Sequence, residues 1–159
     1  MEFNLSAEQK MLLQMVREFA AKSIAPSVAE RDENEHFSRE LFDSLLELGL
    51  AGICFPEKYG GADGDTLTYI LAVEELSRVD DGLGITLSAD VSLGAWPIFQ
   101  YGSEEQKKKF LVPLAEGTKL GAFALTEPNA GTDAAALPAA LADFETLVAA
   151  IGFVLQPGA

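Results

Sequence analysis

The segment 121–133 contains the residues whose types and spacing are best suited to chemistry. An apolar run, 123–125, is followed by a turn that contains threonine, proline, asparagine and glycine. This pattern is typical of a short buried strand that ends in a tight turn. Such a turn collects backbone N–H groups and hydroxyls, where a flat cofactor with hydrogen-bonding edges could bind. The strong ionisable groups of the segment are two carboxylates, so we expect it to hold a ligand.

The scarcity of cysteine and histidine limits the other kinds of site that the chain can form. Among 159 residues there is one cysteine, Cys54, and one histidine, His36. A single cysteine excludes an intrachain disulfide and a cysteine-rich metal site, and a single histidine excludes a two-histidine zinc motif. We interpret 30–36 as a solvated connector rather than the location of a catalytic histidine. The carboxylates show no metal-ligand spacing, so no metal site is predicted.

The charge balance disfavours anionic partners. The chain has 25 acidic and 11 basic residues and a formal net charge of -14. This negative field repels phosphate, so binding to nucleic acid or to an anionic membrane is not expected. The apolar segments are too short to cross a bilayer and the N-terminus lacks a secretory pattern, so we expect a cytoplasmic protein.

Capping residues and apolar stripes predict four helices. Their predicted N-terminal caps are Ser6, Ser38, Asp65 and Ser103. The first and last of these serines are each followed three residues later by glutamine, which completes a capping box. The first three helices are predicted to end at Pro26, near Gly49 and before Gly82. We therefore predict a mainly α fold, an up-and-down helical bundle followed by the first strand of a small β-domain.

Three other segments have less regular patterns. We interpret the glycine-rich segment 55–64 as a surface turn. The segment 82–101 is rich in small and apolar residues, which indicates either a buried element or the wall of a pocket, because Ser88 and Ser92 leave room for a ligand. The lysines at 107–109 follow two glutamates, so we expect them on a solvated helix face with ion pairs along it.

The chain resembles the acyl-CoA dehydrogenase family. The resemblance is carried by the signature 121–133 and by four further segments in the order that the family shows. These segments are 56–61, 72–76, 85–93 and 101–117, and the likeness reaches back to the first helix. About five-sixths of the chain is covered, which a chance motif match would not give. The amino-acid sequence of 85–93 is most similar to that of the short-chain, butyryl-type members.

The resemblance implies a cofactor and the residues that bind it. In that family FAD lies between a small β-domain and a carboxy-terminal helical bundle, with the acyl chain against the flavin. Phe123, Leu125 and Thr126 would lie beside the isoalloxazine ring, where hydrogen-bond donors stabilise reduced flavin. Gly131 would allow close backbone approach, and Thr132 would meet the FAD pyrophosphate and border the CoA portion of the substrate. The further substrate-binding residues that we predict are Leu87, Ser88 and Val91.

The implied reaction is the α,β-dehydrogenation of a short-chain acyl-CoA, with electrons passed to an electron-transfer flavoprotein. The resemblance places the glutamate base beyond residue 159, so no catalytic residue is predicted in this chain. The second flavin-contacting strand is also not found, and we expect the chain alone to be inactive. The predicted domains are an amino-terminal helical domain, 1–119, and the start of the β-domain, 120–133. A homo-oligomer is also expected.

The pattern of the family breaks after Asp133. Apolar residues in the divergent tail, 134–159, repeat at helical spacing, which predicts a helix that ends near Gly152. An alternative to the enzyme is therefore a non-catalytic helical interaction module derived from the family. A relative of the acyl-CoA oxidases is a third reading, and release of hydrogen peroxide would distinguish it.

Overall fold

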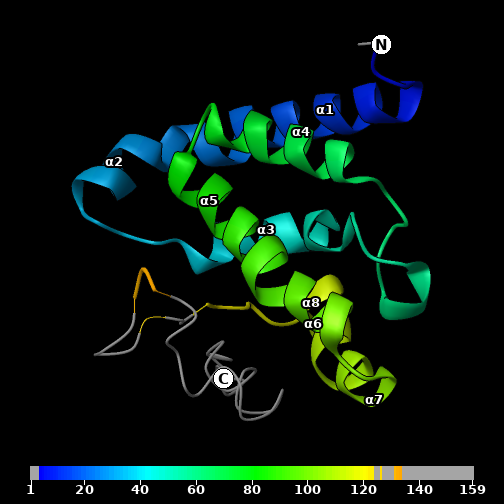
Figure 1. Cartoon of the computed structure of the whole chain (residues 1–159). Coiled ribbons are helices and arrows are strands. Elements are labelled where there is room, and N and C mark those ends of the chain that lie inside the picture. The colour runs from blue at the N-terminus through cyan, green and yellow to red at the C-terminus, as the bar shows by residue number, and fades with distance from the viewer. Residues whose placement is uncertain (1–3, 124–125, 127–130, 134–159) are drawn as a thin grey trace.

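The computed structural model describes residues 4–123, 126 and 131–133, and this part of the chain is built from helices (Figure 1). In chain order the elements are α1 (Ala7–Phe19), η1 (Ala20–Ile24), η2 (Ala25–Ser27), α2 (Val28–Glu33), α3 (Arg39–Glu47), η3 (Leu50–Gly52), η4 (Glu57–Tyr59), α4 (Thr66–Ser77), α5 (Asp81–Ala89), η5 (Asp90–Ala95), α6 (Trp96–Tyr101), α7 (Glu104–Gln106), η6 (Lys107–Leu111) and α8 (Val112–Ala115). Here η1, η5 and η6 are π-helical turns, and η2, η3 and η4 are 3-10 turns. The described residues contain no strand, and the predicted mainly α fold is confirmed.

The predicted helix starts are confirmed by their hydrogen bonds. The Ser6 hydroxyl accepts a bond from the Gln9 backbone N–H at 3.1 Å, and the Gln9 side chain accepts one from the Ser6 N–H at 3.0 Å. Ser103 makes the same reciprocal pair at the start of α7. Ser38 and Asp65 cap α3 and α4 in the simpler way, with one side-chain oxygen each. These bonds satisfy N–H groups that the first helical turn leaves without a backbone partner.

The prediction that the first helix ends at Pro26 is wrong. After α1 the chain continues through η1 and η2 into α2 without leaving helical backbone angles. Pro26 stands in the first turn of η2, where its missing N–H has no intrahelical acceptor to lose. The wide π-helical turn ahead of it absorbs the break in the hydrogen-bond pattern.

The core lies where α1, α4 and α5 meet the shorter elements. α1 and α4 lie side by side, and α5 packs against α4 (Figure 1). Near their crossing, a Cβ added to Gly84 would come within 2.0 Å of the Ser77 hydroxyl, so glycine permits this close approach. Large side chains that are fully buried come from elements along the whole helical domain: Val16, Ile24, Phe42, Leu45, Leu76, Leu87, Ile98 and Leu111.

The interpretation of 55–64 as a surface turn is wrong for its aromatic residues. Phe55 and Tyr59 are buried in the core, and Phe55 contacts the Phe99 ring edge to face with the ring centroids 5.6 Å apart. Gly61, in the same segment, packs directly against the Phe55 backbone, because a Cβ on Gly61 would be 2.0 Å from the Phe55 carbonyl oxygen. The glycines of the segment therefore serve close packing of backbone on backbone as well as turning.

The lysine run is only partly on a solvated face. The side chain of Lys107 is 16% exposed, and its Nζ lies 5.6 Å from the centroid of the Phe99 ring. Its nearest carboxylate is Glu104 at 3.8 Å, which agrees with the expected ion pairing along the helix. Lys107 thus covers the aromatic cluster with its aliphatic stem while its ammonium group keeps a charged partner.

Within the part of the chain that the structure describes, no helix is both long and apolar enough to cross a membrane. The predicted boundary between residues 119 and 120 stays a prediction. The helix predicted in the tail lies outside the described residues.

Candidate functional site

The chain leaves the helical domain at a tight turn after α8. Gly117 has a positive φ of 73° and its N–H donates to the Leu114 carbonyl at 3.0 Å, which ends the helix. A Cβ at this glycine would lie 2.6 Å from the Leu46 Cβ, so only glycine fits both the angle and the space. The next residues run back across η5 toward the predicted flavin-binding turn, 126–132, which we call the cofactor turn. The described residues 120–123 form neither helix nor strand.

A buried carboxylate fixes residues 120–123, which we call the exit segment. Asp90, the first residue of η5, is 1% exposed, and its Oδ1 accepts a hydrogen bond from the Gly121 backbone N–H. The backbone of η5 lies close to Gly121, because a Cβ added to Gly94 would be 3.4 Å from the Gly121 Cα. A Cβ on Gly121 would in turn be 3.0 Å from Asp90 Oδ1 and 3.5 Å from Leu114. The exit segment therefore lies directly on the π-helical turn.

The other oxygen of Asp90 is an exception to the usual pairing of buried polar atoms. Oδ2 is buried and has no hydrogen-bond partner among the described residues. Burial raises the pKa of Asp90 to about 7, while the bond from Gly121 and the positive charge of Arg39 act in the opposite direction. A carboxyl group in this position changes charge near neutral pH, whereas an exposed aspartate does not.

The described residues of the cofactor turn lie at the surface. Thr126, Gly131 and Thr132 are exposed, and no hydrogen bond joins either threonine to another described residue. A Cβ on Gly131 would be 3.5 Å from the Thr126 side chain, so the two ends of the turn lie against each other. Phe123, just before it, is 40% exposed. Two exposed threonines, with a glycine beside one of them and an exposed aromatic residue shortly before them in the sequence, suit a cofactor with a flat ring and a pyrophosphate. Leu125 lies outside the described residues.

The predicted substrate-binding residues fall into two groups. Leu87 and Val91 are buried in the core. Ser88 is half-buried and lines a surface cavity of about 450 Å³ with Val73 and Ile85. Its carbonyl accepts a hydrogen bond from the Tyr69 hydroxyl at 3.1 Å. The substrate roles of these three residues and of Thr132 stay predictions.

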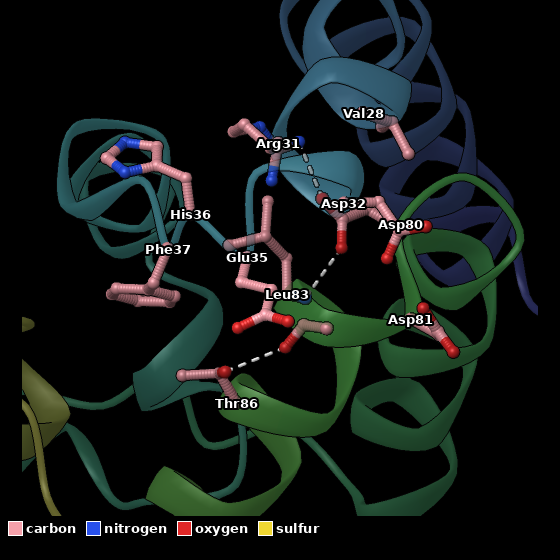
Figure 2. A pocket seen from close by; sticks show the side chains of 11 residues that line it. Val28, Arg31, Asp32, Glu35, His36, Phe37, Asp80, Asp81, Leu83 and Thr86 are labelled. Atoms are coloured by element: carbon pink, nitrogen blue, oxygen red, sulfur yellow. Dashed lines mark hydrogen bonds and ion pairs between the residues drawn. The ribbon is translucent and has the colours of Figure 1, made fainter.

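A second cavity, of about 600 Å³, lies between α2, the following loop and the start of α5 (Figure 2). Arg31 Nη2 contacts Asp80 Oδ2 at 2.6 Å there, and Asp80 also caps α5 through the Leu83 N–H at 2.9 Å. His36 lines the same cavity with Asp32, Glu35 and Asp81. This excess of carboxylates repels the phosphates of CoA or FAD. Among the described residues no cluster of histidine, cysteine and carboxylates could hold a metal ion.

Sequence reasoning missed Asp90 as a site residue, although a signal was present. Asp90 is the only charged residue in the segment 82–101, which is otherwise small and apolar. A carboxylate that is buried on such an apolar element needs a hydrogen-bond donor. The donor is a backbone N–H from beyond α8, which side-chain patterns do not reveal.

Comparisons with known proteins show the family of the chain. Residues 6–118 match the family described as the acyl-CoA dehydrogenase N-terminal domain. The chain belongs to the acyl-CoA dehydrogenase family. It is 59% identical over 137 residues to the short-chain specific acyl-CoA dehydrogenase of Megasphaera elsdenii, an alignment that covers 84% of this chain and 36% of that enzyme. The human mitochondrial short-chain specific enzyme is 40% identical over 132 residues, which are 83% of this chain and 32% of that protein.

Solved structures show the same fold. The butyryl-CoA dehydrogenase of M. elsdenii matches with a TM-score of 0.81 and 59% identity over 84% of this chain and 36% of that one. A chain in the structure described as the electron transferring flavoprotein of Acidaminococcus fermentans matches with a TM-score of 0.83 and 61% identity, over 86% of this chain and 36% of that one. The chain thus spans little more than a third of the length of these relatives.

Proposed function

We propose that this chain is the amino-terminal part of an FAD-dependent, short-chain acyl-CoA dehydrogenase of the cytoplasm. The observation that carries the proposal is the 59% and 54% identity to two bacterial enzymes, both named short-chain specific acyl-CoA dehydrogenases. The exposure of Thr126 and Thr132 is consistent with it. The proposed catalytic base and second flavin strand belong to the part of the enzyme that these 159 residues lack, so the chain alone is proposed to be inactive.

The proposed roles of the chain's own residues are binding and orientation. When bound, FAD supplies the oxidant for removal of two hydrogens from the acyl-CoA. Thr126 would donate from its hydroxyl and N–H to the polar edge of the ring, beside which Phe123 and Leu125 would lie. Thr132 would bind the pyrophosphate, for which Gly131 would leave room. Donors fixed at the ring edge favour the reduced flavin, because negative charge develops there.

The proposal includes two partners besides the acyl-CoA. An electron-transfer flavoprotein is the proposed electron acceptor, which the flavoprotein structure from Acidaminococcus fermentans supports. A second copy of the chain is the other, as a homo-oligomer. Relatives at 41% and 36% identity are named acryloyl-CoA reductase (NADH) and a subunit of a caffeyl-CoA reductase-Etf complex. The same site could therefore run in the reducing direction, and the assay is designed to measure both directions.

The test is a chimera in which residues 1–133 are joined to the part of the M. elsdenii enzyme that follows its aligned segment. We expect the chimera to be yellow with FAD and to lose its flavin absorbance when butyryl-CoA is added without oxygen. In a reductase, crotonyl-CoA would instead reoxidise the reduced flavin faster than butyryl-CoA reduces the oxidised flavin. A folded chimera that binds no FAD, while the intact M. elsdenii enzyme does, contradicts the proposal.

The matched variants are Thr126→Ala and, as control, Thr66→Ala at an exposed position in the first turn of α4. Loss of one neutral hydrogen bond costs about 1 kcal/mol, so Thr126→Ala is expected to weaken FAD binding roughly fivefold. Thr66→Ala is expected to leave FAD binding unchanged. Equal FAD affinity in the two variants would contradict the assigned role of Thr126.

A further inference from the structure

The contact between Asp90 and Gly121 joins the helical domain to the segment that carries the cofactor turn. It brings together residues 31 positions apart, and Thr126 follows Gly121 by five residues. Gly94 and Leu114 bound the same spot from η5 and α8, so the backbone at Gly121 is held on three sides. This anchor lies five residues before the start of the cofactor turn.

We propose that Asp90 is a positioning residue for the backbone that leads into the cofactor turn: its carboxylate holds the Gly121 amide, and the charge on that carboxylate sets how firmly Gly121 is fixed to the helical domain. The ionised group accepts a strong, charge-assisted bond from the amide. Protonation removes the charge assistance and leaves a weaker neutral bond. The use made of the positioned turn rests on the proposed function, but the anchor itself does not.

Few other groups act on this carboxylate. Arg39 on α3 supplies the positive charge that acts on it, and the Tyr69 hydroxyl on α4 lies near enough for its pKa to be raised in part by Asp90. Among the elements packed against η5, α8 and η3 contain no titratable residue. On α6 the titratable residue is Tyr101, which is 79% exposed, and on α5 it is Asp81, which is exposed. The charge of Asp90 is thus set by burial, Gly121 and Arg39.

The second carboxylate oxygen of Asp90, Oδ2, makes the contact with Gly121 sensitive to the charge of the carboxyl group. Because Oδ2 has no partner within the described residues, nothing there compensates the negative charge on that side of the carboxylate. An asparagine fits the same space, keeps an acceptor for Gly121 and cannot ionise. An alanine removes the acceptor. Comparing the two variants therefore separates the effect of the hydrogen bond to Gly121 from the effect of the negative charge on the carboxylate.

The test uses nuclear magnetic resonance on the 159-residue chain without flavin, so its outcome does not depend on cofactor binding. We expect the Gly121 amide proton to move upfield as the pH falls, with the same midpoint, near 7, as the Asp90 carboxyl carbon. In Asp90→Asn the amide is expected to stay protected from hydrogen exchange but to lose this titration. In Asp90→Ala its exchange is expected to accelerate by about tenfold or more.

Asp81→Asn is the matched control, because it makes the same substitution at an exposed position of the adjoining helix. It is expected to leave both the titration and the protection of Gly121 unchanged. A Gly121 resonance in the unmodified chain that does not follow the Asp90 carboxyl overturns the proposal, even if the alanine variant does not fold. Persistence of the titration in Asp90→Asn overturns it as well.

Discussion

Raising the pH through neutrality is expected to destabilise the folded chain through one buried group. Burial raises the pKa of Asp90 from 3.8 to about 7. Because the folded state then holds this proton more tightly than the unfolded state, the stability that Asp90 contributes is highest at low pH and is lost as the pH rises toward and through 7. About three pH units at about 1.4 kcal/mol each give about 4 kcal/mol in total. This is a large share of the roughly 5–15 kcal/mol by which a domain is stable.

The measurable part of this loss falls in a convenient range. Between about pH 5.5 and 8.5 the expected decrease is about 2 kcal/mol, since the rest is lost at lower pH. The carboxylates whose pKa values are lowered by their partners, among them Glu75 beside Arg17 and Asp65 beside Thr68, remain ionised throughout that range. Asp90 therefore dominates the slope.

Urea unfolding followed by Trp96 fluorescence measures the effect, because Trp96 packs against Phe55 and Phe99 and reports loss of the core. We expect the free energy of unfolding of the unmodified chain to fall across the range, and that of Asp90→Asn to remain nearly flat. Asp81→Asn is expected to keep the full slope. A slope that survives in Asp90→Asn, or a stability that rises with pH in the unmodified chain, would refute the reasoning.

Three further substitutions test the packing and one ion pair of the domain. Gly61→Ala places a Cβ 2.0 Å from the Phe55 carbonyl oxygen, so the backbone has to move, and we expect a loss of more than about 3 kcal/mol in urea unfolding. Gly82→Ala meets only a side-chain oxygen at 3.2 Å and is expected to be neutral or stabilising by up to about 1 kcal/mol. Glu75→Gln removes the negative charge and one of the two carboxylate oxygens that accept 2.7 Å bonds from Arg17 at a residue that is 5% exposed, and we expect a loss of about 1–3 kcal/mol.

The control for the ion pair is Glu74→Gln on the same helix. Glu74 is exposed and its bond to Arg78 is an exposed i,i+4 pair, so a change of less than about 0.5 kcal/mol is expected. The hydrogen bond from Arg17 lowers the pKa of Glu75, so the stability from this pair is present near neutrality and is lost as the pH falls through the lowered pKa. An equal effect of Gln at positions 74 and 75 would contradict the assignment.

Local chemistry made much of the fold predictable. The caps at Ser6, Ser38, Asp65 and Ser103 depend on residues three positions away, so the sequence contains both partners. Pro26 misled because its effect depends on whether a new helical turn begins there, which the preceding π-helical turn decides. Lys107 misled because the aromatic rings that it covers come from elsewhere in the chain.

The candidate site was predictable only in part, for the same reason. The threonines and the glycine of the cofactor turn are neighbours in the sequence. Thr126, Gly131 and Thr132 could therefore be predicted as binding residues from the sequence alone. Their anchor was not predictable, because the Asp90 carboxylate meets a backbone amide 31 residues away and not a complementary side chain. Long-range contacts to backbone leave no pattern of residue types.

The central claim is that this helical domain serves a flavin-dependent oxidation of a short-chain acyl-CoA. Anaerobic addition of butyryl-CoA to the purified chimera, with the intact M. elsdenii enzyme measured alongside, tests it most directly. We predict that the visible absorbance of the flavin disappears in both proteins. A folded, FAD-containing chimera whose spectrum does not change, while that of the intact enzyme bleaches, would contradict the claim.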